Sequence, residues 1–224
     1  MTQSALKRPK LLSRSKKISM ANQVLERLKK QLPEPKCELF HHTPFQLLIS
    51  VVLSAQATDK MVNRCMEPVY QKQPDFGPQH VLKMGREGFL KVIRSIGLAP
   101  TKSANVYKLS EIILEKHAGA VPGSRKDLES LPGVGRKTAN VVLAEVFGQP
   151  TLAVDTHVFR VGLRLALHRE ISPLKAEKAL LDVIDDSWLP AAHHWFILHG
   201  RYTCKAQRPL CDSCTIRDIC PSLV

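Results

Sequence analysis

Hydrophobic residues along this 224-residue chain recur at helical rather than strand spacing. The pattern predicts helices over about residues 21–30, 44–53, 59–70, 79–95, 101–117, 125–130, 137–146, 156–165, 175–184 and 188–202. We find no persistent alternation typical of strands and no repeat at solenoid period. The sequence therefore predicts an all-α fold of about ten helices joined by short loops.

One predicted helix, at residues 44–53, is apolar on every side, which favours burial in a core. Thr43 precedes Pro44 at a first helical position, and Gln46 follows three residues after Thr43. This spacing predicts a capping box at the helix start. The helix ends in a polar turn, Ser54–Asp59, which leads into the next helix.

The stretch Leu131–Lys137 joins two predicted helices through a Gly-Val-Gly turn. Glycine tolerates positive φ and close backbone approach, so Gly133 and Gly135 favour a tight bend. Such a bend directs backbone N–H groups at the start of the second helix outward, where they can bind a phosphate oxygen. Lys137 lies in the first turn of that helix, where the dipole disfavours an ammonium, and a neutral amine is a nucleophile. The alternative is a solvated lysine beside an ordinary turn.

The chain is strongly basic, with 33 Lys and Arg against 20 Asp and Glu and a net charge of +13. Six of the basic residues lie in the first eighteen, namely Lys7, Arg8, Lys10, Arg14, Lys16 and Lys17. The remainder is still basic, which indicates a polyanionic partner, and nucleic acid is the commonest one. Anionic membrane is the rival partner, but no apolar run approaches ~18 uncharged residues. We expect no membrane association.

The first twenty residues are basic and lack the apolar core of a signal peptide. They resemble a transit peptide loosely, because they also contain several serines. A disordered basic arm over residues 1–20 is the simpler interpretation. We therefore expect a cytoplasmic, nucleoid-associated protein.

Four of the six cysteines lie near the C-terminus with the spacing Cys-x6-Cys-x2-Cys-x5-Cys, and they are Cys204, Cys211, Cys214 and Cys220. A secreted disulfide framework would spread its cysteines through a small domain, so this grouping indicates a metal or cluster site in a reduced compartment. Structural zinc usually takes two close pairs, whereas one close pair and two wide gaps favour an iron–sulfur cluster, with zinc as the alternative. Lys205 and Arg208 lie in the first gap, where a rigid loop would present them to a phosphate backbone.

Several of these motifs together resemble the endonuclease III family of helix-hairpin-helix DNA glycosylases. The likeness rests on Leu131–Leu143, Val154–His157, His193–Tyr202 and the cysteine spacing, in this order. It extends from about residue 21 to Cys220. The resemblance implies a six-helix barrel over residues 40–149 with the hairpin, and a second domain from residues 21–39 and 150–224 with a 4Fe–4S cluster. It also implies a DNA-binding cleft between them and a monomer acting on duplex DNA.

The resemblance further implies an enzyme of base-excision repair, a DNA N-glycosylase and abasic-site lyase. The family removes oxidised pyrimidines and then cleaves the backbone by β-elimination through a lysine Schiff base. Lys137 and Asp155 stand at the positions of the nucleophilic lysine and the essential aspartate. The alternative for Asp155 is a helix N-cap, for which Asp is a favoured residue, and both roles can hold together.

Other positions carry over as DNA contacts. Gln56 matches a residue that fills the gap left by the extruded nucleotide, and the alternative is an ordinary turn residue. Leu98 matches an inserted wedge, although a hydrophobic residue after a glycine often packs back onto its own helix. His157 would line the pocket mouth or be a buried, hydrogen-bonded histidine. We also expect backbone contacts from Gly133, Val134 and Gly135, whereas the histidines at 193, 194 and 199 are expected to pack beside the cluster.

Two further functions compete with this one. A monofunctional mismatch glycosylase would share the hairpin and the cluster, but relatives that remove adenine lack the lysine and add a C-terminal domain. A non-catalytic iron–sulfur module that binds DNA and senses redox state would not need Lys137 and Asp155 together. The presence of both residues favours the bifunctional enzyme.

Overall fold

The computed structural model describes residues 9–189 and 191–223. The chain divides into two compact units, one formed by Cys37–Gly148 and the other by the segments up to Lys36 and from Gln149 onward. The described residues form helices, turns and loops without any strand, which confirms the predicted all-α class. No helix within them is long and apolar enough to cross a membrane.

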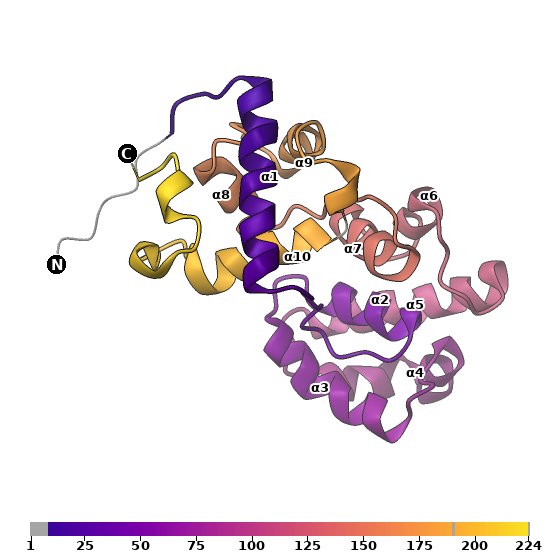
Figure 1. The fold of residues 1–224 in the computed structure, drawn as a ribbon. Coiled ribbons are helices and arrows are strands. Elements are labelled where there is room, and N and C mark those ends of the chain that lie inside the picture. The colour runs from indigo at the N-terminus through magenta and orange to yellow at the C-terminus, as the bar shows by residue number, and fades with distance from the viewer. Residues whose placement is uncertain (1–8, 190, 224) are drawn as a thin grey trace. The chain divides into compact units, whose positions relative to one another are not determined.

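Six α-helices make up the unit Cys37–Gly148, and the ribbon in Figure 1 follows them in order. They are α2 (Pro44–Leu53), α3 (Asp59–Lys72), α4 (Pro78–Ile93), α5 (Ala99–His117), α6 (Arg125–Glu129) and α7 (Arg136–Phe147). Helix α2 is the centre of this unit, because every residue from Phe45 to Leu53 is buried. Helices α3, α5 and α7 pack against it. The prediction of a core helix at residues 44–53 is therefore confirmed.

The start of α2 carries the predicted N-cap but not the complete capping box. Thr43 Oγ1 accepts from the backbone N–H of Gln46 at 3.2 Å, as expected. The side-chain oxygen of Gln46 accepts from the N–H of His42 at 2.7 Å, one residue before the cap. Its Nε2 donates to the carbonyl of Pro74 at 2.8 Å. The predicted reciprocal bond is thus wrong, since the buried Gln46 amide also has to satisfy the Pro74 carbonyl.

Helices α4 and α5 lie side by side in Figure 1 and form the most extensive helix pair of this unit. Helix α4 is kinked at Gly85, which has φ +73°. Ser103 Oγ of α5 donates to the carbonyl of Arg86 at 2.7 Å, just past the kink. This bond fixes α5 against the second half of α4.

The bend between α6 and α7 depends on Gly133, which has φ +79°. A Cβ at this position would lie 2.9 Å from Asn105 Nδ2 and 3.2 Å from Val52 Cγ1. Only glycine combines this backbone angle with such close neighbours. The hairpin can therefore pack closely against α2 and α5 because residue 133 has no side chain.

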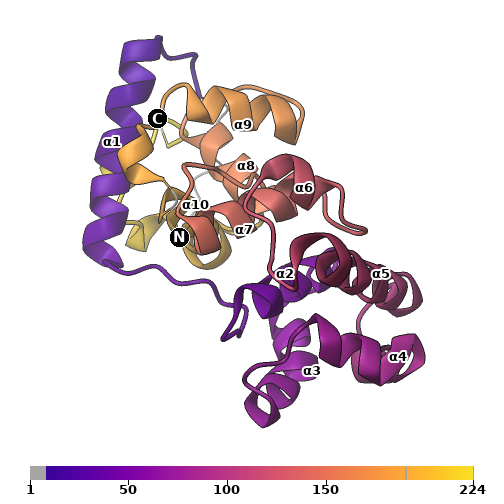
Figure 2. The same ribbon diagram turned by 90° about the vertical axis from the view of Figure 1, so that its right-hand side faces the viewer.

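The other unit contains α1 (Arg14–Gln31), α8 (Thr156–Arg164), α9 (Pro173–Leu181) and α10 (Ala191–Leu198), and Figure 2 shows α8 and α9 beside α1. A 3-10 turn at Asp186–Trp188 precedes α10, a π-helical turn at His199–Thr203 follows it, and short 3-10 turns occur at Cys211–Ser213 and Arg217–Ile219. The shared core includes Val24, Leu25, Leu28, Val158, Val161, Leu180, Trp195 and Phe196.

Helix α1 begins at Arg14, so residues 14–20 are helical and the expected boundary of the disordered arm is wrong. Ser13 caps the helix through its hydroxyl, which accepts from the N–H of Lys16. Arg14 Nε forms an ion pair with Asp182 Oδ2 at 2.9 Å. Further along, Met20 packs against the core of this unit. A serine cap and packing within the unit extend a helix whose local composition is too basic to predict it.

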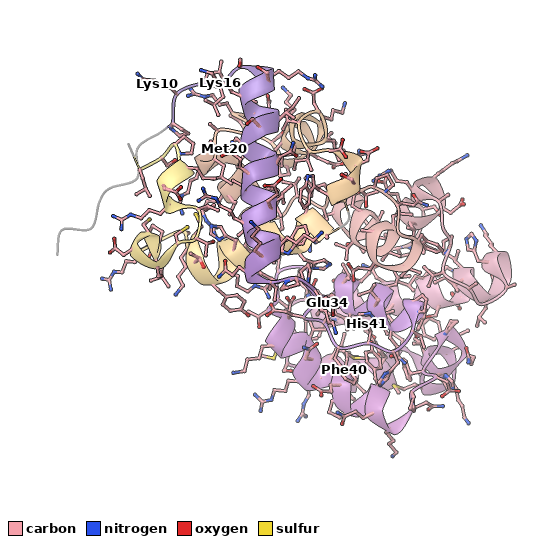
Figure 3. All side chains as sticks on the ribbon, viewed as in Figure 1. Lys10, Lys16, Met20, Glu34, Phe40 and His41 are labelled. Atoms are coloured by element: carbon pink, nitrogen blue, oxygen red, sulfur yellow. The ribbon has the colours of Figure 1, made fainter. Side chains whose placement is uncertain are left out.

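The segment before α1 also contacts this unit. Pro9 is buried, and its carbonyl accepts a hydrogen bond from the Arg169 side chain. Figure 3 shows Lys10 and Lys16 near the N-terminal end of α1, with Met20 further along the helix. Residues 1–8 of the expected arm, which include Lys7 and Arg8, lie outside the described residues.

We predict that Gly133→Ala lowers the free energy of unfolding by about 2–4 kcal/mol, because the new methyl group meets Asn105 and Val52 in addition to the strained angle. Gly148→Ala is the matched control. Gly148 also has positive φ, at +61°, but nothing lies within 4 Å of a Cβ there. The control should lose only about 1 kcal/mol. Urea unfolding measures both, and equal losses would contradict the role of close packing at Gly133.

Candidate active site

The start of α7 follows an exposed glycine turn. Gly135 is the N-cap of α7 and provides no side-chain hydrogen bond to the first turn. Gly133 and Gly135 are exposed, whereas the Val134 side chain is buried and its N–H donates to the carbonyl of Leu131 at 3.1 Å. Contact with a ligand at this turn can therefore involve backbone but not the Val134 side chain. A helix start of this kind suits an anion.

Lys137 lies in the first turn of α7 and is exposed. Its neighbours on the same helix, Ala139, Val142 and Leu143, are buried. The helical periodicity thus places Lys137 on the face of α7 that points away from the core. The Lys137 amine is therefore accessible from solvent at the start of this helix.

Two other residues of this unit, Gln56 and Leu98, have left-handed backbone angles, with φ +56° and +62°. Such angles are uncommon outside glycine and cost roughly 1–2 kcal/mol. Gln56 is exposed, and Leu98 is 58% exposed. Leu98 therefore does not pack back onto its own helix, which was the alternative interpretation for this residue. Both side chains are held outward by strained turns.

Asp155, in the other unit, is the N-cap of α8, as one of its two predicted roles required. Its Oδ1 accepts from the N–H groups of both His157 and Val158 at 2.8 Å. In the part of the chain that the structure describes, Oδ2 takes no part in this cap. The cap therefore fixes the carboxylate and leaves one oxygen for other chemistry, so the two proposed roles are compatible.

His157 is half-buried and belongs to a hydrogen-bond network around Arg160. Arg160 Nη2 donates to His157 Nδ1 at 3.2 Å and to the carbonyl of Gly200 at 2.8 Å. Burial, and secondarily the nearby Arg164, lowers the pKa of the Arg160 guanidinium. A Cβ on Gly200 would lie 2.9 Å from the Cβ of His157, so the π-helical turn approaches α8 closely only because residue 200 is glycine.

The four C-terminal cysteines are free, half-buried and line one cavity. The pKa values of Cys211, Cys214 and Cys220 are raised, first by burial and also by the neighbouring sulfurs. Clustered thiolates repel one another, and a bound cationic core removes that repulsion. Among the described residues, no group of three His, Cys, Asp or Glu is arranged to hold a metal ion in this unliganded geometry. The thiols are gathered around a cavity, which is the donor set that an iron–sulfur cluster uses.

Arg164 holds the first part of the cysteine loop. Its Nη1 donates to the carbonyls of Cys204 and Lys205 at 3.2 and 2.7 Å, and lies 3.3 Å from Cys204 Sγ. Its Nη2 donates to the carbonyl of Ala206 at 3.0 Å. Lys205 and Arg208 are exposed on this loop, and Arg208 has φ +50°. The predicted cationic side chains thus extend from a segment that one guanidinium orders.

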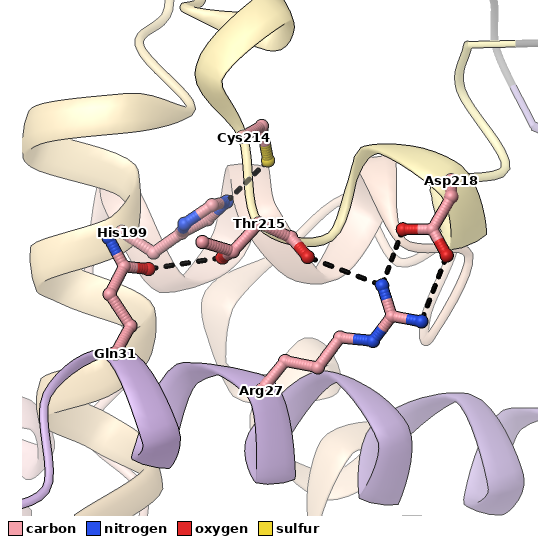
Figure 4. Close-up of polar contacts among 6 residues, drawn as sticks. All are labelled: Arg27, Gln31, His199, Cys214, Thr215 and Asp218. Carbon is pink, nitrogen blue, oxygen red and sulfur yellow. Dashed lines mark hydrogen bonds and ion pairs between the residues drawn. The ribbon is translucent and has the colours of Figure 1, made fainter.

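Helix α1 holds the second part of the loop, as Figure 4 shows. Arg27 makes two hydrogen bonds to the Asp218 carboxylate and a third, at 3.2 Å, to the carbonyl of Thr215. The Thr215 hydroxyl donates to Gln31 Oε1 at 3.0 Å. A paired guanidinium and carboxylate combine charge with fixed geometry. The loop around the last two cysteines is therefore attached to the N-terminal helix.

The three histidines near the cysteines are buried. The rings of His193 and His194 stack edge to face at 5.2 Å. His199 Nε2 lies 3.9 Å from Cys214 Sγ, and burial lowers the pKa of His199 to about 4. His199 is thus a neutral neighbour of a cysteine, which agrees with the expected packing role.

The predicted site residues are distributed over both units. Lys137, Gln56, Leu98 and the hairpin backbone lie in Cys37–Gly148, whereas Asp155, His157, Lys205, Arg208 and the four cysteines lie in the other unit. Within each unit the structure groups them as described above. The meeting of Lys137 and Asp155 at one substrate atom stays a prediction.

Comparison with known proteins adds the decisive observation. The family described as HhH-GPD superfamily base excision DNA repair protein matches residues 49–186. Endonuclease III of Rickettsia felis is 47% identical over 201 residues, which cover 90% of this chain and 93% of that protein. The chain belongs to the endonuclease III family. Endonuclease III of Escherichia coli is 48% identical over 198 residues, 88% of this chain and 93% of the relative.

Solved structures agree with this assignment to the endonuclease III family. A trapped endonuclease III–DNA covalent intermediate superposes with a TM-score of 0.85 at 42% identity, over 95% of this chain and 98% of that one. A thermostable thymine-DNA glycosylase has a TM-score of 0.76 at 21% identity over 92% and 96% of the two chains, which shows a common fold alone. The resemblance predicted from the sequence motifs is confirmed, and with it a role in base-excision DNA repair.

The sequence analysis missed several polar residues that this member of the endonuclease III family uses to hold its loops. Arg160 and Arg164 lie four residues apart on one face of α8, a spacing that could have indicated a shared target. Lys102 is 4% exposed and follows the buried stripe of α5, where a lysine is unusual. Arg27 carried no signal, because its partner Asp218 is 191 residues away in sequence.

Proposed function

We propose that Lys137 is the nucleophile of a bifunctional DNA glycosylase and abasic-site lyase that removes oxidised pyrimidines from duplex DNA. One observation carries the proposal: an exposed lysine in the first turn of the helix that follows the glycine hairpin, in a chain of the endonuclease III family. The net charge of +13 suits a phosphate-rich partner. The relative found covalently attached to DNA supports the same chemistry.

The reaction follows from an amine and a carboxylate at one sugar. The lone pair of Lys137 Nζ forms a bond to C1′ while the bond from C1′ to the base breaks, and the base leaves with the electron pair and takes up a proton. Asp155 accepts a proton from the lysine and stabilises the positive charge on the sugar. The nitrogen lone pair then opens the sugar: the C1′–O4′ bond breaks, O4′ takes up a proton, and the iminium forms between Nζ and C1′. This iminium acidifies C2′–H. Loss of that proton breaks the C3′–O bond and releases the phosphate by β-elimination.

The damaged nucleotide must leave the stack before Lys137 can reach its C1′, at a cost of a few kcal/mol. Gln56 can occupy the vacated space, because its amide offers both a donor and an acceptor to the orphaned base. Leu98 would insert as an apolar wedge between bases. The hairpin N–H groups, together with Lys205 and Arg208, would bind phosphates, and His157 would line the pocket mouth.

The cysteine loop holds a 4Fe–4S cluster in this proposal, with Cys204, Cys211, Cys214 and Cys220 as ligands. The endonuclease III family carries such a cluster, and four free thiols around one cavity fit it. The bound cluster would supply a rigid cross-link for a loop of low hydrophobic content. Arg164 and Arg27 hold the loop from two sides, so they orient the cysteines.

Borohydride added during reaction with a duplex that contains an oxidised pyrimidine should trap a covalent protein–DNA adduct, because it reduces the iminium. Lys137→Gln should give no adduct. Lys137→Arg is the sharper control, since it keeps the positive charge but has no nucleophilic amine. Base release without an adduct from the natural protein would indicate the monofunctional mismatch glycosylase, and no base release at all would indicate the redox-sensing module.

Substitution of Asp155 should separate its two roles. Asp155→Asn keeps a good N-cap and should leave the free energy of unfolding unchanged within ~0.5 kcal/mol, whereas Asp155→Ala should lose about 1 kcal/mol. Both variants should reduce single-turnover base release by about 10²-fold or more, since neither has a carboxylate. Full activity of Asp155→Asn would show that base release does not need the negative charge of the Asp155 carboxylate.

The purified protein should show a visible absorption band near ~400 nm and contain about four irons per chain. Cys214→Ser should lower both values, because it removes one ligand. Cys65→Ser is the control, since Cys65 lies in the other unit next to Ser95 and does not line the cavity. A colourless protein with bound zinc would contradict the cluster.

A further inference from the structure

Helix α5 carries a buried lysine in its first turn. Lys102 is 4% exposed, and its backbone N–H donates to the carbonyl of Leu98, the residue that starts the helix. A buried ammonium is costly unless it is fully hydrogen-bonded. Burial lowers the pKa of Lys102. The side chain is thus retained at a position where an apolar residue would pack at lower cost.

The partners of Lys102 are two backbone carbonyls on another element. Its Nζ donates to the carbonyl of Leu53 at 2.9 Å and to that of Ala55 at 2.6 Å. Leu53 is the last residue of α2, so the ammonium lies at the negative end of that helix dipole. The Ala55 carbonyl belongs to the peptide group that precedes Gln56. Because the peptide group is planar, holding this oxygen fixes the orientation of the peptide plane against which the φ angle of Gln56 is measured.

Gln56 needs such a restraint because its φ is +56°, a strained angle for a residue with a side chain. The turn is closed on its other side by the N–H of Ala57, which donates to the carbonyl of Ser54 at 3.0 Å. A Cβ on Gly97 would lie 3.9 Å from the carbonyl of Gln56, so the loop before α5 is in ordinary contact with this turn. Strained backbone persists where its surroundings determine it.

Lys102 therefore connects the two outward side chains of this unit. Its ammonium holds the turn of Gln56, and that turn is in contact with Gly97, the residue before Leu98, which is also in a left-handed conformation. We infer that Lys102 is a positioning residue that sets Gln56 and Leu98 together for insertion into DNA. The inference rests on the proposed function, in which these two side chains fill the space of the extruded nucleotide.

A purely structural role would make Lys102 only the C-terminal cap of α2. The two roles differ in what they couple. A cap contributes to stability regardless of the Gln56 and Leu98 side chains, whereas a positioning residue has no further effect once those side chains are absent. A mutant cycle distinguishes the two.

The test compares Lys102→Met in the natural background with Lys102→Met in a chain that also carries Gln56→Ala and Leu98→Ala. Single-turnover base release from a duplex with one oxidised pyrimidine should fall roughly 10- to 100-fold in the first comparison. It should fall less than about threefold in the second. Lys108→Met is the matched control, because Lys108 lies on the same helix, is exposed and forms its ion pair with Glu111, three residues further along that helix.

Hydrogen exchange provides a readout that is independent of activity. Lys102→Met should speed exchange of the Ala57 amide, which closes the turn, while amides in the middle of α2 stay protected. Lys102→Gln replaces this variant if it fails to fold, since a shorter amide remains polar but cannot bridge both carbonyls. Lys108→Met should leave the Ala57 amide unchanged.

Equal losses of base release in both backgrounds, or unchanged exchange at Ala57, would overturn the inference. Base release at the natural rate in Lys102→Met would do the same. These outcomes differ from failure of the proposed function, in which the natural protein itself would release no base. An inactive natural protein would overturn both.

Discussion

Helix ends leave backbone N–H and C=O groups without partners inside the helix, and the way these groups are satisfied organises the candidate site. Asp155 caps α8 with one carboxylate oxygen, and Lys102 closes the last turn of α2 with an ammonium. The start of α7 has no side-chain cap, because Gly135 provides none. Two helix ends are thus closed by charged side chains, whereas the N-cap residue of α7 contributes no side-chain bond.

In this arrangement, the side chain of Asp155 that stabilises a helix is also the side chain proposed to act in the reaction. The cap that stabilises α8 also fixes the orientation of a carboxylate, since its Oδ1 accepts two backbone bonds. A carboxylate that caps a helix needs no additional side chain to hold it in place. The charge and the cap can therefore be removed separately, because Asp155→Asn removes the charge and keeps the cap, whereas Asp155→Ala removes both.

The cysteine loop combines a buried anchor, Ile216, with polar bonds from two arginines. Arg164 binds three consecutive carbonyls, and Arg27 binds the Asp218 carboxylate and the Thr215 carbonyl. Arginine suits this role because its planar fork satisfies several acceptors at once. Polar bonds therefore hold the loop around one cavity, whose wall the four thiols share with apolar side chains such as Leu165 and Ile216.

Local sequence determined much of this protein. Periodicity predicted the helices, the all-apolar run predicted the central helix α2, and the Gly-Val-Gly bend and the cysteine spacing predicted the family, because each of these depends on neighbours within a few residues. Tertiary structure decided the rest. The extension of α1 to Arg14, the return bond of Gln46 to His42, and the buried Lys102 all depend on partners from other elements. The exposure of Leu98 and the free oxygen of Asp155 likewise follow from three-dimensional geometry, since a pattern along the chain specifies which face a residue occupies but not which distant backbone group will meet it.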